Sequence, residues 1–291
     1  MPAVDRIIEV NQGTFRSKFN RVPFALHHNL EEHPLLQMTP LTELARSLAA
    51  RPGEVYIDVG AGRVEQRWNE TPRASEPVDE VLAGISAAKA WVVLRRAELD
   101  ARYAALLSRC MSELRDLNGG SWHHRVRVQQ NAIIFITSPC RISTYHIDRE
   151  CNFILQIRGE KVIYVFDQND REVLPEQELE RFWAVDNNAA TYKPQYQSRA
   201  RAFHLGPGDG VHVPVNAPHW VQNGDDSSIT LSINFQFSDS YKANLYRANY
   251  YLRKCGINPT PPGRSRIRDI VKTTAIQGAR LVIKPLRGLR I

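Results

Sequence analysis

The chain has 291 residues and a formal net charge of +7 at pH 7, and 43% of its residues are hydrophobic. This apolar fraction is large enough to bury a core, which excludes a wholly disordered chain. The positive charge is concentrated at one end, because residues 253–291 hold ten Lys and Arg side chains against a single acid, Asp269. The rest of the chain is close to neutral, so we expect no specific nucleic-acid binding, which usually needs a basic patch on the folded face.

Cysteine usage and hydropathy exclude further classes of protein. The four cysteines form no CxxC pair, which argues against a disulfide framework or a zinc ribbon. The apolar runs are far shorter than a membrane span, and the first ten residues are too charged for a secretory signal. We therefore expect a cytoplasmic protein. Its basic C-terminal segment is the part that could contact a membrane.

Residues 1–125 predict a mixed, mostly helical N-terminal region that packs on the core. Leu41, Leu44 and Leu48 recur at helical spacing, which predicts a helix over residues 39–49. Residues 54–59 alternate like a short strand. Apolar side chains recur at near-helical spacing between residues 85 and 117 and predict one or two helices there.

Residues 126–240 predict a mainly β core, a double-stranded β-helix or jelly roll, because short strands alternate with Gly, Pro, Asn and Asp turns. In the last strand, Thr230, Ser232 and Asn234 share one face, and the alternating residues of the other face are apolar. The polar face suits a site for a polar ligand, and the apolar face needs a cover such as the N-terminal helices. The expected strands are 132–137, 141–147, 153–157, 161–166, 201–205, 211–213, 220–222 and 228–237.

The insertion at residues 167–200 separates the fourth and fifth expected strands and includes a possible helix at 176–183. Insertions of this length in a compact barrel are usually functional or disordered. We expect this one to shape the entrance to the site.

The sharpest chemical signal is His146-Ile147-Asp148. In a strand, residues i and i+2 point to the same face, so the imidazole and the carboxylate converge. Two such ligands and one further histidine form the facial triad of non-haem Fe(II) enzymes, which leaves three metal positions open.

His219 is the expected third ligand, because a turn after the strand at 211–213 presents it. His212 and His204 are alternatives. His212 lies on the strand itself, but an inward-facing structural or supporting role suits it better than metal ligation.

Two spacings support the triad: Lys161 follows His146 by 15 positions, and Asn234 follows His219 by 15. Lys161 opens an otherwise apolar strand, and a buried lysine is costly unless it pairs with an anion. A lysine whose ammonium reaches solvent at the strand edge is the alternative. We expect Asn152 and Gln156 to be polar partners on one face of the third strand. The alternative is that they are ordinary polar residues at a turn and a strand edge.

The stretch from His146 to Lys161 resembles the JmjC/cupin-like 2-oxoglutarate oxygenases. It is most similar to the branch containing the asparaginyl hydroxylase that inhibits the hypoxia-inducible factor. Residues 207–214, His219 and the segment from Ile229 through Asn234 match the same branch. The resemblance covers about residues 130–240.

The resemblance implies a dioxygenase that uses Fe(II), 2-oxoglutarate and O2, hydroxylates a C–H bond and releases succinate and CO2. Its metal ligands would be His146, Asp148 and His219. Lys161 and Ser143 would bind the distal carboxylate of 2-oxoglutarate. Asn152 and Asn234 would line the pocket, and Tyr145 and Tyr164 would add walls. The substrate is unidentified and could be a protein side chain or a small molecule.

Two alternatives stay open. One is a non-catalytic cupin-like sensor that binds a metal or ligand without turnover. The other is a metal cupin that needs no cosubstrate, which would use more histidines and makes His212 the residue to check. A histone demethylase is not expected, because the sequence has neither chromatin-reader modules nor a zinc-binding cysteine cluster.

Residues 241–291 predict a basic C-terminal helical tail, interrupted by a Pro- and Gly-rich break at 259–263. Apolar and basic residues interleave after the break, as in an amphipathic helix. Such a tail could form a homodimer, pack on the body or lie on an anionic membrane surface. We expect packing or dimerisation ahead of membrane contact.

Overall fold

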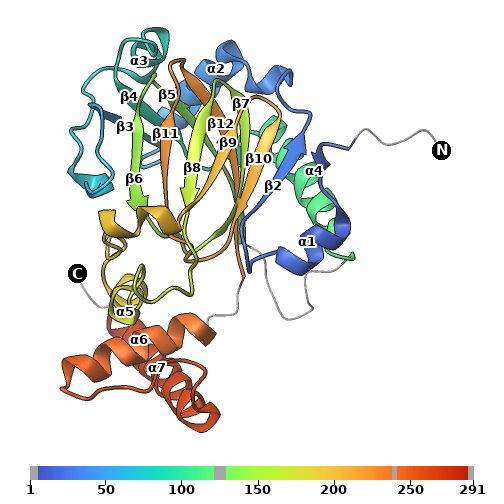
Figure 1. Cartoon of the computed structure of the whole chain (residues 1–291). Coiled ribbons are helices and arrows are strands. Elements are labelled where there is room, and N and C mark those ends of the chain that lie inside the picture. The colour runs from blue at the N-terminus through green and yellow to red at the C-terminus, as the bar shows by residue number, and fades with distance from the viewer. Residues whose placement is uncertain (1–5, 121–128, 238–240, 288–291) are drawn as a thin grey trace.

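A computed structural model describes residues 6–120, 129–237 and 241–287, and two antiparallel sheets form its centre (Figure 1). The larger sheet has the strand order β1-β2-β10-β7-β12-β5-β4-β3 and the smaller one β6-β11-β8-β9. The predicted jelly-roll core is therefore confirmed. The strands are β1 (Ile8–Glu9), β2 (Phe24–His28), β3 (Val55–Val59), β4 (Ala90–Leu94), β5 (Gln129–Thr137), β6 (Ile142–His146), β7 (Cys151–Arg158), β8 (Lys161–Val165), β9 (Arg201–Leu205), β10 (Asp209–Val213), β11 (His219–Asn223) and β12 (Ser228–Gln236).

Strand β12 shows how the sequence sorts its side chains between the two faces of the large sheet. Leu231, Ile233 and Phe235 are buried in the main hydrophobic core. The alternate residues, Thr230, Ser232 and Asn234, line a cavity between the sheets. This is the polar interior face that the alternation predicts, since successive side chains of a strand point to opposite faces.

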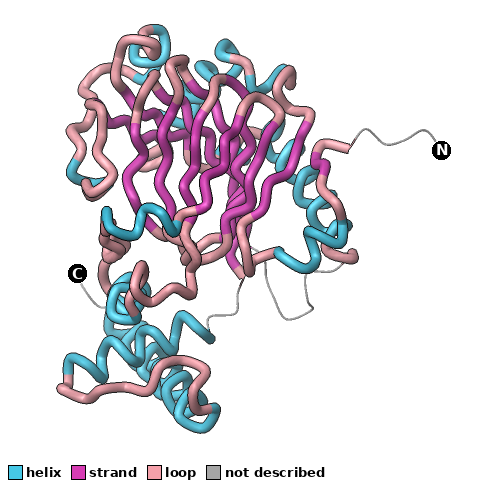
Figure 2. The backbone as a smooth tube through the Cα atoms, in the orientation of Figure 1, coloured by secondary structure: helices cyan, strands magenta, loops and turns pink. Residues whose placement is uncertain are grey.

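Helices from the N-terminal part of the chain cover the outer, apolar face of the large sheet (Figure 2). Helix α4 begins after Asp100, whose side chain accepts a hydrogen bond from the backbone of Arg102, and its buried face includes Leu107 and Leu114. The helices are α1 (Gln12–Lys18), α2 (Met38–Ala49), α3 (Val78–Ala83), α4 (Ala101–Leu117), α5 (Glu176–Ala184), α6 (Tyr241–Lys254) and α7 (Arg266–Arg287). Short 3-10 turns lie at Pro34–Leu36, Trp68–Glu70, Ala97–Leu99 and Pro194–Arg199.

The helical prediction for residues 85–117 is wrong at its start, where residues 90–94 form strand β4. This strand pairs with β3 on one side and β5 on the other. Its sequence, AWVVL, is a short apolar run, which periodicity cannot distinguish from a helix, and its β-branched valines favour a strand. The N-terminal region is thus less helical than expected, because it also supplies β1 to β4 to the large sheet.

Helices α5, α6 and α7 lie together below the sheets (Figure 1). Helix α5 lies in the predicted insertion between β8 and β9, and α6 packs against both α5 and α7. An ion pair joins α6 to α5, with Arg253 Nε 2.6 Å from Glu180 Oε2. None of the described helices combines the length and the apolar character that a membrane span requires.

Candidate metal centre and cosubstrate pocket

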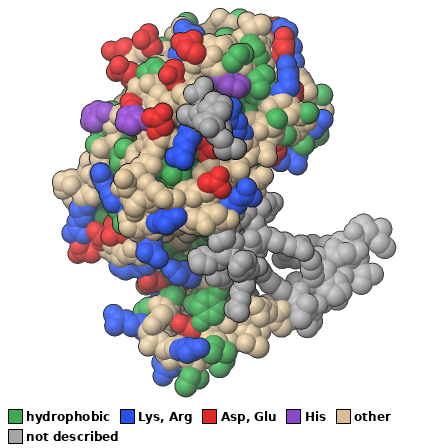
Figure 3. All heavy atoms as spheres, turned by 90° about the vertical axis from the view of Figure 1, so that its right-hand side faces the viewer, with side chains coloured by type: hydrophobic (Ala, Val, Ile, Leu, Met, Phe, Trp, Pro, Cys, Tyr) green, Lys and Arg blue, Asp and Glu red, His purple; other side chains and the backbone are tan. Residues whose placement is uncertain are grey.

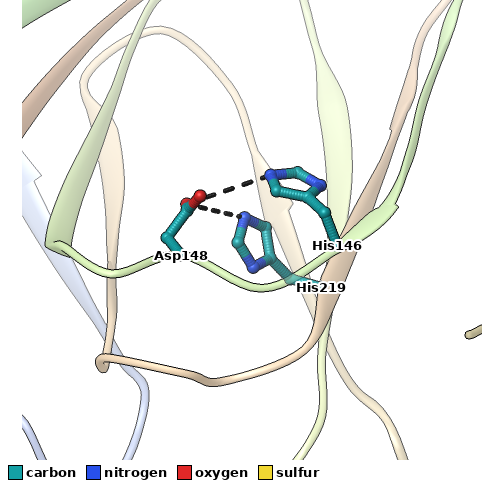
Figure 4. A group of neighbouring side chains, drawn as sticks. All are labelled: His146, Asp148 and His219. Atoms are coloured by element: carbon teal, nitrogen blue, oxygen red, sulfur yellow. Dashed lines mark ion pairs between the residues drawn. The ribbon is translucent and has the colours of Figure 1, made fainter. Parts of the chain in front are cut away.

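Strand pairing brings the three predicted metal ligands together. His146 ends β6 and pairs directly with His219, the first residue of β11. Asp148 follows β6 by two residues, and its Oδ2 lies 3.9 Å from His146 Nε2 and 3.7 Å from His219 Nε2 (Figure 4). One ligand atom of each residue lies within 4.8 Å of the others, which is close enough to share one metal ion.

The backbone fixes which nitrogen of each imidazole faces the carboxylate. His146 Nδ1 lies 2.7 Å from the carbonyl oxygen of Thr144, and His219 Nδ1 lies 2.9 Å from that of Ala217. A carbonyl only accepts hydrogen bonds, so each Nδ1 carries a proton, and in the neutral imidazole Nε2 is then the nitrogen whose lone pair can bind a metal. Burial lowers the pKa of His219, which favours this neutral, metal-binding form.

Asn152 orients the carboxylate of the triad. Its Nδ2 donates a hydrogen bond of 2.7 Å to Asp148 Oδ2 from the start of β7. Hydrogen bonds of this kind to a metal-binding carboxylate fix its orientation and tune its affinity for the metal. Asn152 therefore contacts a triad member directly, in addition to lining the cavity.

A cavity of about 380 Å³ extends from the triad to Lys161. Lys161 is buried, and its Nζ donates a hydrogen bond of 2.6 Å to Thr230 Oγ1. Thr230 in turn donates to Gln156 Oε1 at 2.9 Å. Within the described ranges, no acidic side chain forms an ion pair with Lys161, and burial lowers its pKa to about 7. The ammonium is thus available to an anion that enters the cavity.

The three predicted metal ligands and the four predicted cosubstrate-site residues all line this one cavity: His146, Asp148, His219, Lys161, Ser143, Asn152 and Asn234. Asn234 accepts a hydrogen bond of 3.0 Å from Ser232 and donates one of 3.2 Å to Asn131. Their roles toward a metal or cosubstrate remain predictions, but their convergence from five strands and the segment after β6 is a property of the fold.

The predicted wall residues Tyr145 and Tyr164 do not line the cavity. Tyr145 packs against Phe166 and Tyr192 in a separate cluster. Tyr164 stacks on Trp220 with ring centroids 4.3 Å apart. Both side chains pack elsewhere on the small sheet, so this part of the prediction is wrong.

His212 has a structural role remote from the triad. It is fully buried, its Nδ1 lies 3.0 Å from the carbonyl oxygen of Asn152, and its Nε2 accepts a hydrogen bond of 2.9 Å from the backbone N–H of Asn20. Its ring contacts the rings of Phe19, Phe24 and Phe153, and burial lowers its pKa to about 3. Both nitrogens are used, which leaves none for a metal. His204 is exposed on β9.

An aromatic wall of the cavity was missed by the sequence reasoning. Trp91 and Phe135 stack with ring centroids 5.7 Å apart, and both line the cavity with Trp68. Residue 91 falls in the range predicted as helical, so its place beside β5 was not predicted. The two β-branched residues that follow it, Val92 and Val93, are the local signal that favours a strand there.

The lining of the cavity includes residues from the insertion, and a role of the insertion at the entrance stays a prediction. Phe182 and Asn187 line the cavity. Arg149, the residue after Asp148, donates a hydrogen bond of 2.8 Å to the carbonyl oxygen of Phe182 and lies over the rings of Phe182 and Trp183. Helix α5 is thereby tied to the segment that carries the triad carboxylate.

A sequence model of a family described as "Cupin-like domain" matches residues 21–243. The chain belongs to this cupin-like family. No curated protein matches its sequence. Among solved structures, an X-ray structure of Escherichia coli YcfD is similar with a TM-score of 0.53 and 16% identity, over 94% of this chain and 68% of that chain.

A second similar structure is YcfD from the same organism, described as a ribosomal oxygenase in complex with cobalt and 2-oxoglutarate. It gives a TM-score of 0.51 and 15% identity, and the match covers 92% of this chain and 66% of that chain. The cupin-like chain spans about two thirds of the length of YcfD, and the likeness is one of fold.

Proposed function

We propose that this cupin-like chain is an Fe(II)- and 2-oxoglutarate-dependent dioxygenase that hydroxylates a C–H bond of a substrate still to be identified. The single observation that carries the proposal is the pairing of a His-Asp-His group with a buried, unpaired ammonium in one cavity. Iron bound there would supply the activation of O2, with 2-oxoglutarate oxidised to succinate and CO2 and one oxygen atom transferred to the substrate.

The residues present fit this metal and this cosubstrate. Two neutral imidazoles and one carboxylate, each held by a hydrogen bond, form a donor set suited to Fe(II) with open positions. Lys161 offers a positive charge at the far end of the cavity, which suits the distal carboxylate of a dicarboxylate. The complex of YcfD with cobalt and 2-oxoglutarate supports the same pairing in a neighbour of this fold.

The surroundings of Lys161 strengthen its attraction for an anion. Thr230 pairs across the sheet with Phe135, so the aromatic wall lies beside the lysine end of the cavity. Apolar walls exclude water and lower the local dielectric, which makes an ion pair stronger than it would be in solvent. Ser143, on β6, adds a hydroxyl to the same cavity.

The test is succinate formation by the purified chain with Fe(II), 2-oxoglutarate and air, measured by NMR. We expect succinate above a protein-free control, because such enzymes turn over slowly without substrate. Turnover should be lost under anaerobic conditions and in Asp148→Ala. His204→Ala, which changes an exposed histidine outside the cavity, is the matched control and should retain turnover.

The alternative of a non-catalytic sensor gives a different result in the same experiment. A sensor would bind the metal with His146, Asp148 and His219 and still form no succinate. Full metal occupancy with no succinate, in the presence of saturating 2-oxoglutarate and O2, would therefore refute the dioxygenase and favour the sensor.

A further inference from the structure

Exposed apolar side chains concentrate in the C-terminal helices and the connection between them. Of the nine exposed large hydrophobic side chains among the described residues, six lie between residues 241 and 271. Figure 3 shows hydrophobic and basic side chains close together on the surface at the bottom of the view, where these helices lie. Such a concentration on one small part of a protein marks an interaction surface.

Helix α7 turns apolar side chains toward solvent and polar side chains inward, which is the reverse of an ordinary amphipathic surface helix. Its apolar side chains Ile267, Ile270 and Val271 are 78%, 50% and 63% exposed. Its buried face carries polar side chains instead, among them Asp269 at 2% and Lys272 at 9% exposure. A surface helix normally buries its apolar stripe against the body, so this stripe is left for another partner.

Hydrogen bonds hold α7 in this orientation. Asp269 Oδ2 accepts a hydrogen bond of 2.8 Å from the backbone of Gly263, and Lys272 Nζ donates one of 2.6 Å to the carbonyl oxygen of Thr260. Both partners belong to the connection between α6 and α7. Rotating the helix to bury its apolar stripe would break both bonds, so the outward direction of the stripe is built into the fold.

The basic side chains around the exposed apolar residues of α7 indicate an anionic partner. Arg266 and Arg268 are exposed and flank Ile267 on its two sides, since successive helical residues are about 100° apart. Residues 253–291 hold ten basic side chains and one acid. A second copy of the chain would bring two such basic segments together, which is unfavourable, whereas an anionic lipid surface attracts them.

We propose that the exposed face of α7, formed by Ile267, Ile270 and Val271, docks on an anionic membrane surface together with Arg266, the first residue of the helix, and the exposed Arg264 two residues before it. The helix lies in the plane of the interface, with its apolar side chains among the acyl chains and its arginines near the headgroups. The proposal does not depend on the oxygenase activity, because it uses none of the residues that line the cavity.

The test is co-sedimentation of the full-length chain with vesicles of phosphatidylcholine alone and with vesicles in which about a third of the lipid is phosphatidylserine. We expect binding to the anionic vesicles that weakens with added salt, since salt screens surface charges. Ile267→Ser combined with Ile270→Ser and Val271→Ser should weaken this binding at least tenfold, because it removes the inserted apolar area. Arg264→Gln with Arg266→Gln should weaken it by roughly tenfold or more and reduce the salt dependence.

Val22→Ser with Leu99→Ser is the matched control, because it removes exposed apolar side chains far from α7 in the sequence. This variant should bind the anionic vesicles like the unchanged chain. Equal binding of the triple serine variant would overturn the proposal, as would absence of binding to anionic vesicles. A dimer in light scattering that the triple serine variant dissociates, without vesicle binding, would instead assign the stripe to a second copy.

Discussion

Lys161 donates its hydrogen bond to Thr230 at 2.6 Å, in a cavity wall where burial lowers the lysine pKa to about 7. Such a lysine gains its counter-charge only when an anion arrives. This relationship makes cosubstrate binding and protein stability depend on the same ammonium group.

Lys161→Ala should weaken 2-oxoglutarate binding by roughly a hundredfold or more, because it removes a desolvated partner of the distal carboxylate. Isothermal titration with an inert divalent metal in place of iron measures the affinity, and metal stoichiometry should not change. Lys242→Ala, at an exposed position, is the control. Unchanged affinity for 2-oxoglutarate in Lys161→Ala would remove this residue from the cosubstrate site.

Lys161→Met should make the ligand-free protein more stable at pH 7, by roughly 1–4 kcal/mol, because it replaces a buried, unpaired charge with an apolar chain. The pH dependence follows from the lowered pKa. Between about pH 7 and the ordinary lysine pKa of 10.5, the unfolded state binds more protons at this site than the folded state. The free energy of unfolding of the parent protein should therefore rise with pH across that window. Urea unfolding at several pH values checks this, and an equal pH slope in Lys161→Met would contradict it.

Asn152→Ala should weaken metal binding by about 10- to 100-fold, because Asp148 loses the hydrogen bond that orients its carboxylate. Competition with a chelator measures the affinity. Asn131→Ala is a matched control, since Asn131 lines the cavity but accepts its hydrogen bond from Asn234, which is not a triad residue. Equal metal affinities in the two variants would show that the Asn152 bond does not matter to the metal.

Asp58→Asn should destabilise the fold by roughly 3–5 kcal/mol, because it leaves the buried Arg141 without a counter-charge. Arg141 precedes β6 and Asp58 lies on β3, so this pair ties the two sheets together at their open edge. Asp79→Asn breaks the exposed pair with Arg46 and should change little. Equal urea midpoints for the two variants would contradict a structural role for the buried pair.

His212→Ala should lower the free energy of unfolding by about 2–4 kcal/mol and leave metal stoichiometry unchanged. Both ring nitrogens serve backbone groups, and the ring fills space among phenylalanines. Metal analysis of the purified variant shows whether His212 is a structural residue or a metal ligand. Loss of metal in a variant that is still folded by circular dichroism would instead point to a cupin centre with more histidines.

The barrel and the triad could be predicted because their signals are local. Turn residues separate the strands of the core, and the i, i+2 spacing of His146 and Asp148 places both on one face wherever a strand or its extension forms. The strand before His219 and its preceding turn made that histidine the natural third ligand. These inferences need no knowledge of which strands become neighbours.

What the sequence did not reveal depends on strand neighbours far apart in the chain. Trp91 faces the cavity only because β4 pairs with β5, and nothing near Trp91 specifies that pairing. The resemblance implied that Tyr145 and Tyr164 would be pocket walls, whereas Tyr145 packs in the cluster around Phe166 and Tyr164 stacks on Trp220. The outward stripe of α7 likewise follows from hydrogen bonds to Thr260 and Gly263 that helical periodicity does not encode.

Strand β2 pairs with β10, and the register places Phe24 opposite His212. A ribosome makes the first of these strands long before the second. At about 5–20 residues per second, Phe24 waits on the order of ten seconds or more for its partner to be synthesised. During that interval its apolar side chain and unpaired backbone are open to other chains. The newly made N-terminal segment is therefore where we expect chaperones to act on this protein, and where overexpression at high temperature should produce aggregates first.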